Sequence, residues 1–258
     1  MELTGRVEVQ DLYKDLGGQP VLRGISLEVA PGEAVAILGP SGCGKTVFLR
    51  HLVGLLVPDR GGVRLDGETL HRLPPARLRE IRAQVGMVFQ GAALLDSLTV
   101  GENVAFPLRR HRRVPESRLK EIVAEKLNLV GMGGTEDRMP AELSGGMRKR
   151  VAIARALALD PKIVLYDEPT AGLDPVTARA VDRLMTEVRR KTGTTTVLVT
   201  HDLLTAFAVA DRVAVMEAGR FVALGPREAV RANPHPLVQA FLRSSGLVGL
   251  PQEADGEA

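Results

Sequence analysis

The chain has 258 residues, 45% apolar and 25% charged, and this ordinary composition excludes a fibrous repeat or a wholly disordered chain. Lys and Arg number 34 against 31 Asp and Glu, so the formal net charge is only +3 and we expect no nucleic-acid partner. The single cysteine, Cys43, cannot form an internal disulfide, and the N-terminal sequence lacks the features of a secretory signal. No stretch is long and apolar enough to cross a membrane, so we expect another chain to supply any membrane span.

Short β-branched and apolar runs predict strands at Val7–Val9, Ile25–Val29, Ala34–Leu38, Val85–Phe89, Ile163–Tyr166, Thr195–Thr200 and Val213–Met216. Helical patterns predict helices at Thr46–Val53, Glu116–Leu129, Gly146–Leu159, Pro175–Arg190, Leu203–Ala210 and Leu237–Leu242. Strands that alternate with helices are typical of a mostly parallel sheet covered on both faces. Between about Gly91 and Leu159 the pattern is helical only, which predicts a helical subdomain inserted into an α/β core.

A phosphate-binding loop is predicted between the third strand and the first helix. The run Gly39, Pro40, Ser41, Gly42, Cys43, Gly44, Lys45, Thr46 matches G-x-x-x-x-G-K-[ST]. Its glycines let successive N–H groups point into one concavity, and the helix N-terminus adds its positive dipole. Lys45 can then reach the β- and γ-phosphates, and the Thr46 hydroxyl can join a Mg²⁺ shell. The alternative is a chance glycine-rich turn.

Polar residues also follow three other predicted strands. Asp167 and Glu168 follow Ile163–Tyr166, Gln90 follows Val85–Phe89, and His201 follows Thr195–Thr200. The carboxyl ends of parallel strands share one crevice, so Asp167 is expected near Thr46 and its metal. Glu168 is expected to orient or deprotonate water, Gln90 to join the metal or water shell, and His201 to contact the γ-phosphate. The alternative for Asp167 and Glu168 is an exposed strand end, and for His201 it is a structural or solvated histidine.

The sequence 143–147, LSGGM, resembles the signature motif of ABC-type ATPases. In order around it, GPSGCGKT, Gln90, LYDEP, AGLD at 171–174 and His201 resemble the Walker A, Q-loop, Walker B, D-loop and H-loop motifs of that family. The resemblance implies an α/β fold with a P-loop NTPase (RecA-like) core of mostly parallel sheet, an N-terminal antiparallel β portion and an inserted α-helical subdomain. It implies an ATP-binding domain over residues 1–243, with the helical subdomain at about 91–160. Residues 244–258 are predicted to be a disordered tail.

The resemblance also implies a head-to-tail homodimer that holds two ATP molecules between its subunits. Each ATP would contact the phosphate loop of one subunit and Ser144, Gly145 and Gly146 of the other. Carried over by position, Glu168 is the catalytic base and His201 senses the γ-phosphate. Asp174 couples the two sites, and the Mg²⁺ ligands are Thr46, Gln90 and Asp167.

Two positions depart from the family pattern. Met147 replaces the usual glutamine of the signature motif, which leaves the serine and glycine donors in place. Leu16 stands where an aromatic side chain usually stacks on adenine, and Tyr13 lies three residues earlier. These departures put adenine stacking, and with it base selectivity, in question.

Among ABC systems, a transporter subunit is favoured over DNA-repair or ribosome-associated ATPases, because the chain has no coiled-coil insertion and only one ATPase domain. Several strings, including FQGAALLDSLTVGENVAFPLR at 89–109 and GGMRKR at 145–150, resemble the Mce/Mla group, which moves lipids or other hydrophobic molecules. The resemblance implies permease subunits, an MCE-type substrate-binding subunit and a peripheral place on the cytoplasmic face of the inner membrane. An importer for a polar solute is the alternative. Residues 92–107 would receive a permease helix, with apolar contacts from Ala93, Leu94, Leu95, Val104 and Phe106.

Overall fold

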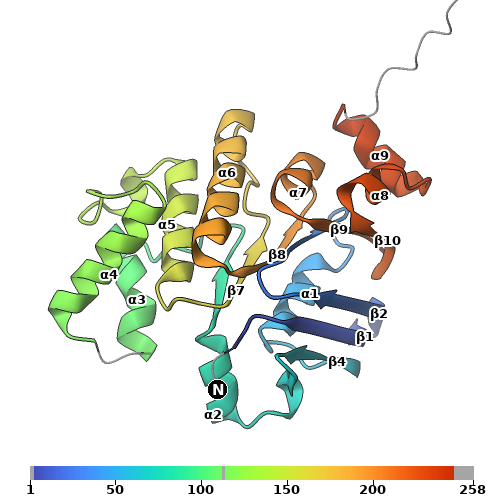
Figure 1. Ribbon diagram of the computed structural model, residues 1–258, viewed down its shortest axis with the longest axis horizontal. Coiled ribbons are helices and arrows are strands. Elements are labelled where there is room, and N and C mark those ends of the chain that lie inside the picture. Colours follow the sequence, from blue (N-terminus) through green and yellow to red (C-terminus); the bar gives the residue numbers. More distant parts are fainter. Residues whose placement is uncertain (1–2, 112–113, 247–258) are drawn as a thin grey trace, which may run out of the picture.

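The computed structural model describes residues 3–111 and 114–246. It contains a six-stranded sheet, a smaller antiparallel sheet and helices on both sides of the larger sheet (Figure 1). Of the tail predicted at 244–258, residues 247–258 lie outside the described residues. No helix within the described ranges has both the length and the apolar character needed to cross a bilayer.

The larger sheet carries the phosphate loop. Its strand order is β10-β9-β3-β8-β7-β6, and all neighbours are parallel except β10, which runs antiparallel to β9. The strands are β3 (Ala34–Leu38), β6 (Val85–Val88), β7 (Ile163–Asp167), β8 (Thr195–Thr200), β9 (Arg212–Glu217) and β10 (Arg220–Pro226). Because the parallel strands end at the same edge, the residues after β3, β6, β7 and β8 meet there.

Alternate residues of the parallel strands enter two different cores. In β3 all five side chains are buried; Ala36 and Leu38 join one core, whereas Val35 and Ile37 join the other. Successive side chains of a strand point to opposite faces, so a sheet buried on both faces gives an unbroken apolar run. This double burial explains why the sequence of β3 is AVAIL and does not alternate with polar residues.

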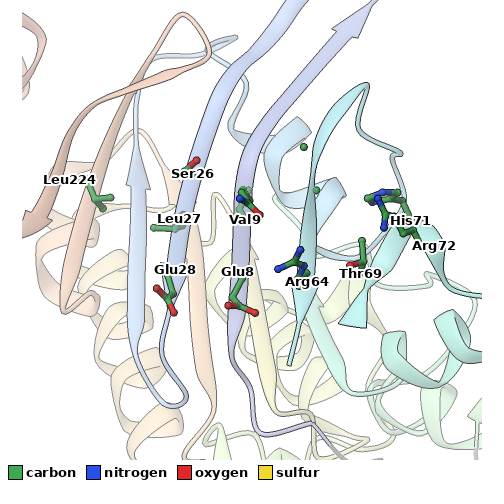
Figure 2. A pocket seen from close by; sticks show the side chains of 13 residues that line it. Glu8, Val9, Ser26, Leu27, Glu28, Arg64, Thr69, His71, Arg72 and Leu224 are labelled. Atoms are coloured by element: carbon green, nitrogen blue, oxygen red, sulfur yellow. The ribbon is translucent and has the colours of Figure 1, made fainter. Parts of the chain in front are cut away.

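The antiparallel sheet has the order β2-β1-β4-β5, with β1 (Val7–Leu16), β2 (Gln19–Val29), β4 (Arg60–Leu65) and β5 (Glu68–Thr69). The strands predicted at Val7–Val9 and Ile25–Val29 are the buried ends of longer strands. On the outer face of this sheet lies a hollow of about 640 Å³ (Figure 2). Charged residues such as Glu8, Glu28 and Arg64 line it.

The remaining elements are helices. The first group comprises α1 (Lys45–Leu52), the 3₁₀ turn η1 (Leu70–Arg72) and α2 (Pro75–Arg82). Between β6 and β7 the described chain forms α3 (Val100–His111), α4 (Glu116–Leu129), the 3₁₀ turn η2 (Pro140–Glu142) and α5 (Gly145–Leu157), which group together at the left of Figure 1. The last group comprises α6 (Pro175–Thr192), α7 (Leu203–Val209), α8 (Arg227–Arg231) and α9 (Pro236–Ser244).

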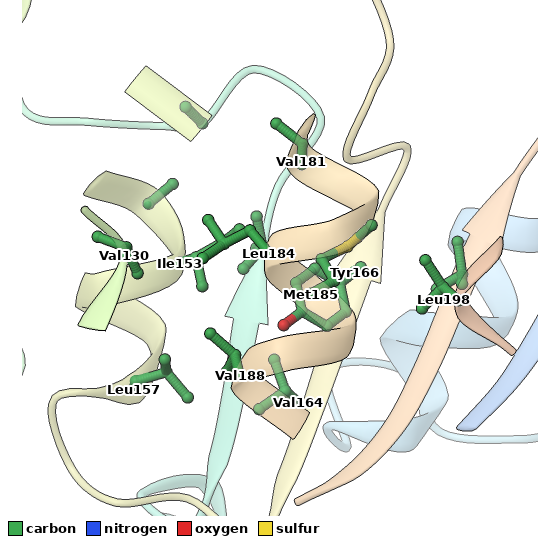
Figure 3. Packing of buried hydrophobic residues seen from close by; sticks show 14 of the residues in the cluster. Val130, Ile153, Leu157, Val164, Tyr166, Val181, Leu184, Met185, Val188 and Leu198 are labelled. Atoms are coloured by element: carbon green, nitrogen blue, oxygen red, sulfur yellow. The ribbon is translucent and has the colours of Figure 1, made fainter. Parts of the chain in front are cut away.

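Helices α5 and α6 are fixed against β7 by one of the two cores (Figure 3). Tyr166 of β7 is 1% exposed, and Ile153 of α5 and Val181 of α6 are fully buried. Burial of an aliphatic side chain such as Ile153 or Val181 contributes about 1.5–3 kcal/mol relative to an exposed one. The packing therefore holds the first residues of α5 and α6 in fixed positions relative to the strand end that carries Asp167.

Candidate functional site

The phosphate loop connects β3 to α1 and has the backbone that its sequence predicts. Gly44 caps α1 with a φ of 112°, and a Cβ there would lie 3.0 Å from Leu22 Cδ2 and 3.1 Å from the Val21 carbonyl oxygen. Glycine is therefore required both by conformation and by space. With no side chain capping the helix, the first N–H groups of α1 are available to an anion.

Lys45 lies across this loop. Its Nζ donates hydrogen bonds to the carbonyls of Gly39 at 2.7 Å and Pro40 at 3.0 Å, and its side chain is buried. The ammonium is thus held over the mouth of the loop, where it can meet a phosphate.

A hollow of about 450 Å³ opens beside the loop. Its lining joins loop residues to side chains from three other strand ends: Val21, Ser41, Gly42, Gly44, Lys45, Thr46, Val47, Gln90, Glu168 and His201. The larger hollow on the antiparallel sheet (Figure 2) contains none of the predicted site residues. The phosphate loop and the predicted residues Gln90, Glu168 and His201 line the 450 Å³ hollow and not the larger one, so we place the reactive site there.

Thr46 and Asp167 form the pair expected of a magnesium site. The Thr46 hydroxyl donates to Asp167 Oδ1 at 3.1 Å, and the charges of Arg50 and Lys45 also act on this carboxyl. Burial raises the pKa of Asp167, and the neighbouring charge of Glu168 adds to this rise. A buried carboxylate beside a hydroxyl, with Gln90 in the lining of the same hollow as Thr46, is a hard oxygen donor set, which fits Mg²⁺.

Glu168 occupies a strained and well-fixed position. Its φ is 47°, which is uncommon for a residue with a side chain, and its N–H donates to the Val199 carbonyl at 2.9 Å. Oε1 lies 3.5 Å from Lys45 Nζ. Oε2 accepts from the His201 N–H at 3.2 Å and lies 2.9 Å from His201 Nδ1. The carboxylate is therefore aimed at the hollow between an ammonium and an imidazole.

The residues of the signature and D-loop motifs begin helices outside the lining of this hollow. Ser144 caps α5 and accepts from the Met147 N–H at 3.3 Å, and Asp174 caps α6 through Thr177 N–H at 3.0 Å. A Cβ on Gly146 would lie 2.5 Å from Thr177 Cγ2, so glycine allows the two helix starts to touch. Within one chain, Ser144, Gly145, Gly146 and Asp174 are thus not brought to the phosphate loop.

Cys43 differs from its neighbours in the loop. Its side chain is 7% exposed and packs in the core beneath the loop, and burial raises the pKa of its thiol. Only its backbone can face a phosphate.

The surface predicted for a permease helix is corrected in part. A hollow of about 340 Å³ is lined by Ala93, Leu95 and Phe106, with Phe89 and Pro107 in addition. Val104 is fully buried and Leu94 is partly buried against the core, and neither lines this hollow. Both side chains pack against the same core, and the local sequence does not distinguish inward-facing from outward-facing apolar residues in this segment.

Lys149 of α5 is a further residue beside the site that the sequence motifs do not indicate, and its side chain is buried beside Gln90 and Glu168. A signal was present. Gly146, Lys149, Ile153 and Leu157 recur at helical spacing on the buried face of α5, so a lysine stands in an apolar row.

Comparison with known proteins agrees with this geometry. Residues 22–171 match the family model described as ABC transporter. The chain therefore belongs to the ABC transporter family, as one of its ATP-binding and ATP-hydrolysing subunits.

Two sequence relatives and one solved structure illustrate what the chain is similar to. The chain is 42% identical over 257 residues to the "Probable ribonucleotide transport ATP-binding protein mkl" of Mycobacterium leprae (strain TN), covering 99% of this chain and 74% of that protein. It is 40% identical over 236 residues to the "Intermembrane phospholipid transport system ATP-binding protein MlaF" of Escherichia coli (strain K12), covering 92% and 88%. A solved structure of the ATP-binding cassette MJ0796, a dimer bound to ADP and Pi, superposes with a TM-score of 0.78 at 32% identity, covering 85% of this chain and 98% of that chain. The predicted family and fold class are confirmed.

Proposed function

We propose that two copies of this chain bind two ATP molecules between them, head to tail. Ser144 and Asp174 lie outside the lining of the phosphate-loop hollow of their own chain, so a second copy is needed to bring a signature motif to it. The N-terminus of α5, capped by Ser144 and followed by Gly145 and Gly146, offers N–H donors to a γ-phosphate. The dimeric state of the related cassette with ADP and Pi supports this arrangement.

In this proposal the strand-end residues divide the work of hydrolysis. Lys45 binds the β- and γ-phosphates, and Glu168 accepts a proton from the attacking water. The bond from the γ-phosphorus to the bridging oxygen breaks, and ADP and inorganic phosphate leave. His201 holds Glu168 and contacts the γ-phosphate. Thr46, Asp167 and Gln90 would hold Mg²⁺, which when bound neutralises phosphate charge.

We infer that hydrolysis drives transport through separate membrane subunits. The hollow lined by Leu95 and Phe106 exposes apolar side chains, with Phe106 49% exposed, and is a suitable binding site for a permease helix. The chain would then be peripheral, on the cytoplasmic face of the inner membrane.

Lipids or other hydrophobic molecules are the proposed cargo, and a permease and an MCE-type subunit the proposed partners. The observation that carries this is the 40% identity to a protein named for phospholipid transport, which extends over 92% of this chain. Met147 in the signature motif and the sequence after Gln90 resemble the same group. A polar solute remains the second candidate, because the mycobacterial relative is named for ribonucleotide transport.

The test is purification of the tagged full chain from its host membranes, with bound proteins and lipids identified by mass spectrometry. A polytopic permease, an MCE-type subunit and phospholipid above the level in an untagged control would support the proposal. A permease with a soluble solute-binding protein would replace the lipid by a polar cargo. Ribosomes or DNA-repair proteins would overturn the transport role itself.

A further inference from the structure

Lys149 is a buried cation that the ATPase chemistry proposed above does not use. It lies on the first turns of α5 and is only 5% exposed. A buried ammonium is costly unless strong acceptors surround it. The hydrogen-bond acceptors of Lys149 therefore indicate its role.

Those acceptors are two backbone carbonyls beside the phosphate-loop hollow. Lys149 Nζ donates to the carbonyl of Gln90 and, at 3.3 Å, to the carbonyl of Glu168. The two carbonyls are equivalent in register, since Val88 of β6 pairs with Tyr166 of β7 and each carbonyl lies two residues further on. One ammonium thus joins the chain segments that leave two adjacent strands.

The Glu168 backbone needs such support. Its φ of 47° is a conformation that persists only where surrounding contacts enforce it. The N–H of Glu168 is fixed by β8 through Val199, and its carbonyl is fixed by α5 through Lys149.

A second cation on the same helix acts on the same segment. Arg155 donates to the carbonyls of Ala92 at 2.8 Å and Ala93 at 2.6 Å. Both alanines have positive φ, 62° and 49°. Helix α5 therefore holds the segment that begins at Gln90 through hydrogen bonds from two side chains, Lys149 and Arg155. Of these two, Lys149 also donates to Glu168.

We propose that Lys149 is a positioning residue for ATP hydrolysis: its ammonium, shared between the Gln90 and Glu168 carbonyls, sets the direction of the Glu168 carboxylate. This inference rests on the proposed role of Glu168 as the base. It assigns to α5 a second function besides presenting Ser144: the same helix aligns the carboxylate of its own subunit. Lys149 itself does not line the nucleotide hollow.

The test compares Lys149→Met, Lys149→Gln and Lys149→Arg in the full chain purified with its membrane partners. Methionine keeps most of the length of the lysine side chain and removes its hydrogen-bond donors, whereas arginine keeps the charge and the donors. We expect K149M to lower kcat about tenfold to a hundredfold, since small misplacements of a reacting group cost this much, with KM for ATP changed less than about twofold. K149R should recover most of kcat. The matched control is Arg150→Met, because Arg150 donates to the Val130 carbonyl at 2.9 Å, on the same helix but within the helical insertion.

Normal kcat in folded K149M would overturn the inference. A second outcome would also overturn it: K149M has a lower Tm and loses both kcat and ATP binding, and K149R does not restore them. That result would show that Lys149 only stabilises the fold. If K149M does not fold, K149Q and K149R give the same comparison. Glu168→Gln distinguishes failure of the proposed function from failure of this inference. Full hydrolysis by E168Q would show that Glu168 is not the base. An inactive E168Q together with a fully active K149M would exclude only the role of Lys149.

Discussion

Asp182 of α6 is a buried acid whose protonation should change the stability of the fold. Its side chain is 2% exposed. Oδ2 lies 2.8 Å from Arg179 and 3.4 Å from the Thr205 hydroxyl, while Oδ1 has no hydrogen-bond partner in the described chain. Burial raises the pKa of Asp182 to about 6, although Arg179 opposes this rise.

The sign and size of the effect follow by linkage. The ordinary pKa is 3.8, so the native state binds the proton more tightly than the unfolded chain does. Asp182 therefore makes the free energy of unfolding decrease as the pH rises from about 4 to about 6. The total decrease is about 3 kcal/mol, since each pKa unit corresponds to about 1.4 kcal/mol. Asp182→Asn removes this titration, so the stability of D182N relative to the unmutated chain should increase by about 3 kcal/mol between pH 4 and pH 7.

Urea denaturation followed by circular dichroism at pH 4, 5, 6 and 7, at constant ionic strength, measures this difference. Comparing the two proteins at each pH cancels the titration of every other group. A difference that stays constant with pH, or that moves in the opposite direction, would refute the reasoning. A carbon-13 NMR titration of the Asp182 carboxyl checks the pKa itself.

Three further predictions concern the nucleotide and permease surfaces. Because burial raises the pKa of the Cys43 thiol, maleimide should label the native chain at least about a hundredfold more slowly than the urea-unfolded chain; rapid native labelling would contradict this. Leu95→Glu and Phe106→Glu should abolish co-purification of the permease and leave ATP binding intact, whereas Leu55→Glu, at another exposed leucine, should leave both unchanged; a retained permease would exclude this hollow as its binding site. Leu16→Tyr should tighten ATP binding about threefold to tenfold by restoring a stacking ring, measured by equilibrium fluorescence, and an unchanged Kd would show that adenine does not reach this position.

Much of the fold could be predicted because, in most elements, the hydrophobic periodicity agrees with the glycine, proline and charged residues at the element's ends. Helix α4 has the predicted bounds, with Pro115 before its first turn, and β3 has the predicted bounds because it is apolar throughout. Helix α3 was not predicted, since Gly101 and Pro107 interrupt its pattern and its stability depends on packing against α4 and α5. Strand β4, with the sequence RGGVRL, has too few apolar residues to be recognised and depends on pairing with β1.

The candidate site was predictable for a topological reason. Parallel strands bring their carboxyl ends to one edge, so Thr46, Asp167 and Glu168 could be placed together from strand ends alone. Contacts that cross between elements could not be predicted in this way. The choice of Glu168 carbonyl as an acceptor for Lys149 depends on how α5 packs, and so does the burial of Val104. The predicted domain bounds and residue roles stay predictions.

The central claim is that this chain hydrolyses ATP with Glu168 as the base at the phosphate-loop hollow. It is tested most directly by phosphate release from radiolabelled ATP under single-turnover conditions, comparing the unmutated chain with Glu168→Gln, both purified with their membrane partners. We expect E168Q to bind ATP and to dimerise on it but to release phosphate at least about a hundredfold more slowly. Release by a folded, ATP-bound E168Q at the unmutated rate would show that Glu168 is not the base.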